Sequence, residues 1–168
     1  MWIRLDLEGL KFELKIEDYL PNQTLDGKWS NVSFNFEFQN IIKYSQERSE
    51  NLLCYEIDEL LLNMEDLLND KLVERKIVEE IEPDFTFIFN PKDEQKSGIN
   101  MEMKVRLWDG GLTCNYFATT FGREEIEQLL LYLLLITGKI EPEDLRIKKL
   151  IENGIIYGEL NNKLQFIY

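Results

Sequence analysis

The stretch that decides the fold class is DGKWSNVSFNFEFQN, residues Asp26–Asn40. In it Val32, Phe34, Phe36 and Phe38 alternate with polar residues, which is the period-two pattern of a strand with one buried face. The polar positions are Ser33, Asn35, Glu37 and Gln39. We therefore expect a strand whose phenylalanines form a surface on which helices pack, while its other face stays polar and open.

The same alternation recurs along the chain and predicts further strands in two groups. The first group covers residues 2–7, 10–16, 29–39 and 52–56. A turn at Glu8 and Gly9 separates its first two strands, and the polar segment Lys43–Asn51 is expected to be a hairpin loop. The second group covers residues 85–89, 101–107 and 112–118. Its last two strands are joined by the tight turn DGG at residues 109–111.

A helix is predicted after each group of strands. The first begins at Ile57, because apolar residues recur from there at steps of three and four. The second covers residues 123–137 and stops at Gly138. Residues 10–70 and 84–138 therefore share a βββα order. The predicted fold class is α+β, with one antiparallel sheet of about six strands and both helices on one face.

The C-terminal part is expected to be an extension of a domain formed by residues 1–138. Residues 139–168 contain a predicted helix, EPEDLRIKKLIENG, and a terminal hairpin around Asn161 and Asn162. The helix over 123–137 is apolar nearly all round, so one sheet cannot cover it completely. We expect the extension to fold back onto the same domain and cover it. A homodimer through helix 123–137 is the alternative.

Composition favours a single acidic domain. The 168 residues include 19 basic and 32 acidic side chains, for a net charge of −13. An acidic surface repels phosphate and anionic lipid, so neither nucleic acid nor a membrane is an expected partner, whereas a basic protein is. The N-terminal MWIRLDLEGLKFEL carries charges throughout, unlike a signal peptide. Cys54 and Cys114, both placed on strands, are expected to be reduced in a cytoplasmic protein, and a single disulfide between them is the alternative.

The sequence lacks the usual apparatus of an enzyme. It contains no histidine, which removes the commonest general base and zinc ligand. It has no C-x-x-C, no G-x-G-x-x-G and no P-loop. Asp58, Glu59, Glu65 and Asp66 lie on the predicted solvent face of the first helix, where exposed carboxylates make poor general acids. We therefore expect a non-catalytic protein without cofactor or metal, and keep a carboxylate-dependent hydrolase as a minor alternative.

Acidic residues are concentrated between Glu47 and Asp84. This segment holds thirteen acidic and four basic residues, which leaves a net charge of −9. It is interpreted either as a solvated face or as a docking face for a basic protein. The acidic candidates for partner binding are Glu56, Asp58, Glu59, Glu65, Asp66, Glu79, Glu80 and Glu82.

Trp108 is a further candidate for partner binding. It is out of phase with Met103, Val105 and Leu107, which places it on the strand face away from the helices. Exposed aromatic residues often anchor interfaces. Packing against neighbouring strands on the open face is the alternative interpretation.

The order of these segments resembles the WapI family of bacterial immunity proteins. The resemblance covers about residues 10–138. It rests on DGKWSNVSFNFEF, CYEIDELLLNMEDLL, EEIEPDFTFIF and MEMKVRLWDGGLTCNYFATTFGREEIEQLL, and residues 139–168 lie outside it. It implies stoichiometric binding to the toxic C-terminal domain of a contact-dependent or cell-wall-associated toxin, inside the cell that makes it. A cytosolic adaptor or dimeric scaffold of unknown partner is the alternative function.

Overall fold

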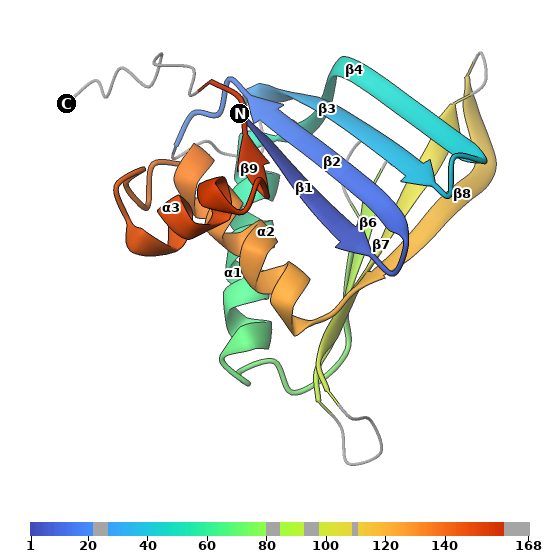
Figure 1. The fold of residues 1–168 in the computed structure, drawn as a ribbon. Coiled ribbons are helices and arrows are strands. Elements are labelled where there is room, and N and C mark those ends of the chain that lie inside the picture. The colour runs from blue at the N-terminus through green and yellow to red at the C-terminus, as the bar shows by residue number, and fades with distance from the viewer. Residues whose placement is uncertain (22–26, 80–84, 93–97, 109–110, 160–168) are drawn as a thin grey trace.

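The computed structural model describes residues 1–21, 27–79, 85–92, 98–108 and 111–159. Their strands form two antiparallel sheets, and their helices gather on one side of both (Figure 1). The α+β class and the antiparallel pairing are confirmed. The expected strands are, however, divided between two sheets instead of joined in one.

The first sheet has the order β4-β3-β2-β1-β9. Its strands are β1 (Trp2–Leu7), β2 (Leu10–Glu17), β3 (Trp29–Phe38), β4 (Ile42–Leu53) and β9 (Ile156–Tyr157). β3 lies at the second position from one edge. Its Val32, Phe34 and Phe36 are buried, while Asn35 and Glu37 lie on the outer face. The predicted alternation is therefore observed except at Ser33, which is buried and accepts a hydrogen bond from the Arg48 amide at 3.0 Å.

The second sheet has the order β5-β6-β7-β8. Its strands are β5 (Lys76–Glu79), β6 (Phe85–Asn90), β7 (Asn100–Trp108) and β8 (Leu112–Phe121). α1 follows β4 directly along the chain, and β4 and β5 are edge strands of different sheets that do not pair. Each group of strands pairs with its own neighbours along the chain, as short connections favour.

The helices connect and cover the sheets. They are α1 (Cys54–Leu68), α2 (Arg123–Ile136) and α3 (Leu145–Glu152). α2 packs against α1, against β1 of the first sheet and against β7 and β8 of the second. Its Tyr132 is completely buried: the hydroxyl accepts a hydrogen bond from the Ile16 amide at 3.0 Å and donates one to the Met1 carbonyl at 3.2 Å.

Phenylalanine side chains fill the space between the two sheets. Phe34 of β3 lies 5.2 Å from Phe85 of β6, measured between ring centroids. Phe36 lies 5.2 Å from Phe117 of β8 and 5.0 Å from Phe12 of β2. Edge-to-face and offset contacts of this kind add to the energy of burial. Phe34 and Phe36 of β3 therefore pack against the second sheet, a contact that the sequence did not predict.

Two local predictions were wrong. Lys43–Asn51 is part of strand β4 and not a loop. Because β4 is an edge strand with charged, exposed residues, it lacks the apolar alternation by which sequence reasoning recognises strands. Cys54 is the first residue of α1 and not part of a strand, so the helix begins three residues earlier than predicted.

The C-terminal extension contacts both the helices and the first sheet. α3 packs against α2, with Ile147 and Leu150 buried. β9 pairs with β1 through Trp2 opposite Tyr157. The hairpin predicted around Asn161 and Asn162 lies outside the described residues. Within the described residues, no helix is long and apolar enough to cross a membrane.

Candidate functional site

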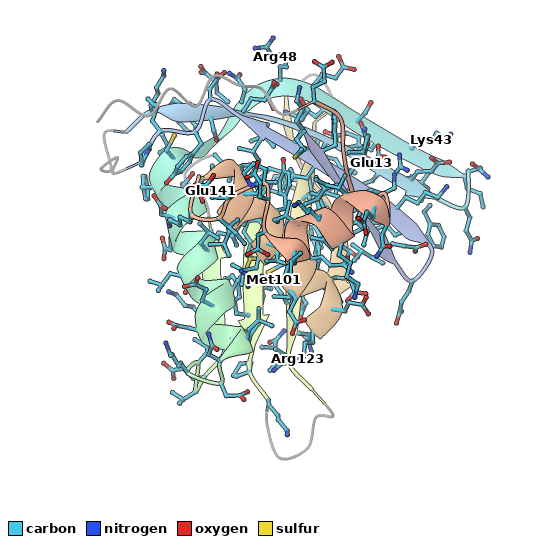
Figure 2. The ribbon with its side chains drawn as sticks, turned by 60° about the vertical axis from the view of Figure 1, so that its left-hand side comes forward. Glu13, Lys43, Arg48, Met101, Arg123 and Glu141 are labelled. Atoms are coloured by element: carbon cyan, nitrogen blue, oxygen red, sulfur yellow. The ribbon has the colours of Figure 1, made fainter. Side chains whose placement is uncertain are left out.

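The candidate site is a surface on α1, so the exposure of each predicted residue decides its role. Charged side chains such as Lys43, Arg48 and Glu141 project from the periphery of the molecule, whereas Met101 is completely buried (Figure 2). The acidic residues predicted to bind a partner fall into two groups. Some bond to other groups of the same chain, and the others remain accessible to solvent.

Glu56 belongs to the fold and not to the surface. It is 3% exposed, and its carboxylate accepts a hydrogen bond from the Leu53 backbone amide at 2.7 Å. This contact satisfies one of the amides at the start of α1 that have no partner within the helix. The Glu56 side chain is therefore engaged inside the folded chain, and its role in partner binding stays a prediction.

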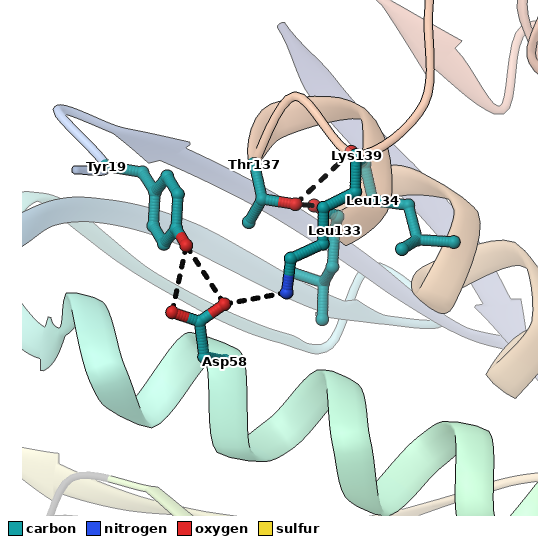
Figure 3. Close-up of polar contacts among 6 residues, drawn as sticks. All are labelled: Tyr19, Asp58, Leu133, Leu134, Thr137 and Lys139. Atoms are coloured by element: carbon teal, nitrogen blue, oxygen red, sulfur yellow. Dashed lines mark hydrogen bonds and ion pairs between the residues drawn. The ribbon is translucent and has the colours of Figure 1, made fainter. Parts of the chain in front are cut away.

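Asp58 also acts within the fold. Its carboxylate accepts hydrogen bonds from the Tyr19 hydroxyl at 2.9 Å and from Lys139 Nζ at 2.8 Å (Figure 3). Burial and the neighbouring Asp58 carboxylate raise the pKa of the Tyr19 hydroxyl above its ordinary value. Next to this cluster, Thr137 Oγ1 donates to the Leu133 carbonyl at 2.8 Å and ends α2. Asp58 therefore joins α1 to the segments that follow β2 and α2.

Three acidic residues and one leucine of α1 form what we call the acidic stripe: Glu59, Leu62, Glu65 and Asp66. Their spacing of three and four residues places them on one side of the helix. Leu62 is 57% exposed, and Glu65 has no side-chain partner among the described residues. Glu59 lies 3.6 Å from Lys76 Nζ, and Asp66 lies 4.0 Å from Lys71 Nζ. Both pairs are partly exposed and therefore weak.

The remaining candidates are spread over the second sheet and its connections. Glu79 is exposed at the end of β5. Glu80 and Glu82 lie outside the described residues. The backbone of Trp108 ends β7 opposite Leu112, and its side chain lies outside what the structure describes. The structure therefore groups Glu59, Glu65 and Asp66 on α1, with Glu79 on the strand that Lys76 begins.

A polar cluster on the outer face of the first sheet was not predicted from the sequence. Glu13 accepts hydrogen bonds from Arg4 Nε at 2.7 Å, from Tyr157 Oη at 2.9 Å and from Asn35 Nδ2 at 3.1 Å. Partial burial acts to raise the pKa of Glu13, but these hydrogen bonds outweigh it and lower that pKa below its ordinary value. Only pairing across four strands brings these residues together, so spacing along the chain gives no signal for them.

The surroundings of these residues offer little to a chemical reaction. Within the described ranges, no three acidic or cysteine side chains form a group that could hold a metal ion. A cavity between the sheets and helices is lined by apolar side chains, among them Phe12, Leu60, Phe87 and Met103. Cys54 is buried, and this burial raises the pKa of its thiol, while Cys114 is exposed.

The fold and the surface therefore define an α+β protein whose candidate site is a partly exposed helix face. Comparison with protein families gives a match to the immunity protein WapI-like family over residues 3–140. The chain belongs to this family, as the resemblance predicted. The family implies the role of an immunity protein, with a toxin in general as the protein partner.

Comparisons with individual proteins add little. No curated protein matches the chain. Among solved structures, the crystal structure of WHY1 from Arabidopsis thaliana is similar with 11% sequence identity and a TM-score of 0.34, over 95% of this chain and 94% of that one. At this TM-score no argument about fold or function is transferred.

Proposed function

We propose that this protein neutralises a cognate toxin domain by stoichiometric binding, without chemistry of its own. The observation that carries the proposal is membership of the WapI-like immunity family over residues 3–140. The apolar lining of the internal cavity and the absence of histidine agree with a binding role. The cytoplasm is the proposed location, because an immunity protein protects the cell in which the toxin is made.

The proposed contribution of the acidic stripe is to attract a basic toxin domain. The chain carries a net charge of −13, and Glu59, Glu65 and Asp66 place part of it on one helix face. Charge of this kind accelerates encounter with a partner of opposite sign more than it strengthens the final complex. Leu62, exposed between these carboxylates, supplies an apolar contact that burial would stabilise.

Binding to the toxin domain encoded immediately upstream tests the proposal. The purified toxin domain and this chain should form a one-to-one complex, measured by isothermal titration calorimetry, and the toxin should lose its activity in that complex. No complex at micromolar concentrations of both proteins would reject the proposal. If the complex forms but the toxin remains active in it, binding is supported and the neutralising function is rejected.

The alternative of a dimeric scaffold gains no support from α2. Its leucines Leu130, Leu131 and Leu134 are partly buried and pack against the core. Part of the apolar surface that suggested a contact between two copies is thus covered inside one chain. A homodimer through helix 123–137 stays a prediction, and light scattering on the isolated chain would test it.

A further inference from the structure

The described sheets have four edges, and they differ in how well they are protected from other strands. β9 has two residues, and β5 has four, of which Lys76 and Glu79 are charged. β4 is long but carries charged residues and two register shifts against β3. Short length, charge and irregular register are the usual means by which proteins block pairing at an edge. These three edges are therefore protected.

β8 is the exception among these edges. Its ten residues, LTCNYFATTF, contain no charge and no proline, in a chain of which 30% is charged. It is the last strand of its sheet, so no described strand pairs with its second edge. Half of the backbone amides and carbonyls of such a strand point away from its neighbour and can bond a further strand.

Part of β8 is also regular enough to accept a strand. Pairing with β7 is unbroken from Tyr116 opposite Arg106 to Phe121 opposite Met101. The irregular part lies nearer the hairpin, where Thr113 Oγ1 accepts a hydrogen bond from the Asn115 amide at 3.1 Å. Phe121 itself is completely buried, so residues 116–120 remain available, and five residues match the length of an ordinary strand.

We infer that the open edge of β8, over residues 116–120, binds an extended segment of the toxin as an additional strand. This inference rests on the proposed function and names its main contact. Strand addition of this type draws its affinity from backbone hydrogen bonds and its specificity from alternate side chains. The sheet would grow from four strands to five and lose its unprotected edge.

The side chains beside this edge set the chemistry of the incoming segment. Tyr116 is 59% exposed on the outer face, with Lys104 Nζ 5.3 Å from its ring and Arg106 opposite it in register. Two basic residues here disfavour lysine and arginine at the nearest outward positions of the segment. An uncharged segment with an aromatic or β-branched residue beside Tyr116 fits best.

Charge argues against a second copy of this chain as the occupant. Two copies would each bring a net charge of −13, and net charge of this size favours the monomer. A basic toxin body is attracted by the same charge, including the acidic stripe on α1. The toxin therefore fits the edge of β8 better than a second copy does.

Hydrogen–deuterium exchange on the complex with the upstream toxin domain tests the inference directly. Amides in the peptide covering residues 112–121 should exchange more slowly in the complex than in the free chain. The peptide covering residues 42–53 is the matched control, since it contains the long edge strand β4. It should exchange at the same rate in both states.

Proline variants test the same contact through affinity. Neighbouring amides of a strand point in opposite directions, so one of Ala118→Pro and Thr119→Pro breaks a bond to β7, and the other removes only an amide on the open edge. The variant whose melting temperature equals that of the unmodified protein is the one whose proline replaces an amide on the open edge. It should weaken toxin binding by about fivefold or more. The stable member of the pair Tyr44→Pro and Ser45→Pro on β4 is the control and should leave binding unchanged.

The outcomes separate this inference from the function on which it rests. The inference is overturned if a complex forms, its residues 112–121 exchange as fast as in the free chain, and the stable proline variant of β8 binds the toxin with unchanged affinity. The proposed function would still stand in that case. No complex at all overturns both. An isolated chain that dimerises with residues 112–121 protected shows a second copy at the edge, which overturns the inference.

Discussion

At the scale of single residues, the carboxylates of α1 differ in role although they look alike in the sequence. Glu56 and Asp58 bind groups of their own chain, whereas Glu65 has no side-chain partner in the described residues. A buried carboxylate is tolerated only where hydrogen bonds replace water, and the capped start of α1 provides such a site. Hydrogen-bond partners therefore separate the two groups better than exposure does, since the Asp58 side chain is 32% exposed and that of Asp66 is 35% exposed.

Replacing Glu56 by alanine should lower the free energy of unfolding by about 1–2 kcal/mol, because it leaves the buried Leu53 amide without its acceptor. Urea denaturation measures the change. The control Glu56→Gln keeps an acceptor oxygen and should lose less. Toxin affinity should stay the same in both variants, and a strong loss of affinity at full stability would return Glu56 to the binding surface.

Tyr19 should make the stability of the protein fall at alkaline pH. Burial and Asp58 raise the pKa of Tyr19 in the folded chain, so the unfolded chain loses this proton first, near pH 10. The stabilisation is complete below that pH and decreases as the pH rises above it. Thermal denaturation between pH 8 and pH 11 measures it.

The variant Tyr19→Phe isolates this contribution. It removes both the titrating group and the hydrogen bond to Asp58, so the variant should be less stable at pH 8 and should lose less stability on going to pH 11. Tyr132, whose pKa is also raised by burial, remains in the variant and keeps part of the alkaline dependence. Equal slopes in both proteins would contradict the assignment.

At the scale of elements, α1 presents its carboxylates on one side, so that side can be tested as a unit. The triple variant Glu59→Lys, Glu65→Lys and Asp66→Lys should slow association with a basic toxin by about tenfold at low salt. It should also flatten the dependence of the association rate on salt, because screening acts on the same charges. Surface plasmon resonance at several salt concentrations measures both.

A matched control separates the place of the charge from its amount. Glu141, Glu143 and Glu152 are exposed near and on α3, and reversing all three changes the net charge equally. This control should slow association much less than the α1 variant if the acidic stripe faces the toxin. Equal slowing by both variants would mean that only net charge matters and that the stripe is not the face approached.

At the scale of the whole molecule, aromatic contacts between the sheets hold the two groups of strands together. Phe34 is completely buried and touches Phe36 of its own strand, Tyr44 of β4 and Phe85 of the second sheet. Phe34→Ala should therefore cost about 3–5 kcal/mol of stability, measured by denaturant unfolding. The control Tyr116→Ala, at an exposed ring, should change stability by only about 0.5 kcal/mol. A small loss at Phe34 would show that the sheets hold together without it.

Much of the local structure could be predicted because it depends on neighbours along the chain. The alternation in β2, β3, β6 and β7 and the three-to-four spacing in α1 and α2 each lie within one segment. β4 was not predicted over its full length because it is an edge strand with one solvent-exposed face. Its residues therefore lack the alternation of apolar and polar side chains that marks a strand in a sequence. Glu13 and its partners were missed for a different reason: Arg4, Asn35 and Tyr157 come from three other strands.

The sequence by itself determined the α+β class, the positions of most strands and helices, the acidic character of residues 47–84 and the lack of histidine. These follow from composition and from periodicities set by backbone geometry. Only the tertiary structure decided that the strands form two sheets, that Glu56 is buried and that β8 is left with an open edge. Strand pairing and burial depend on contacts between residues distant in the chain, which local patterns do not encode.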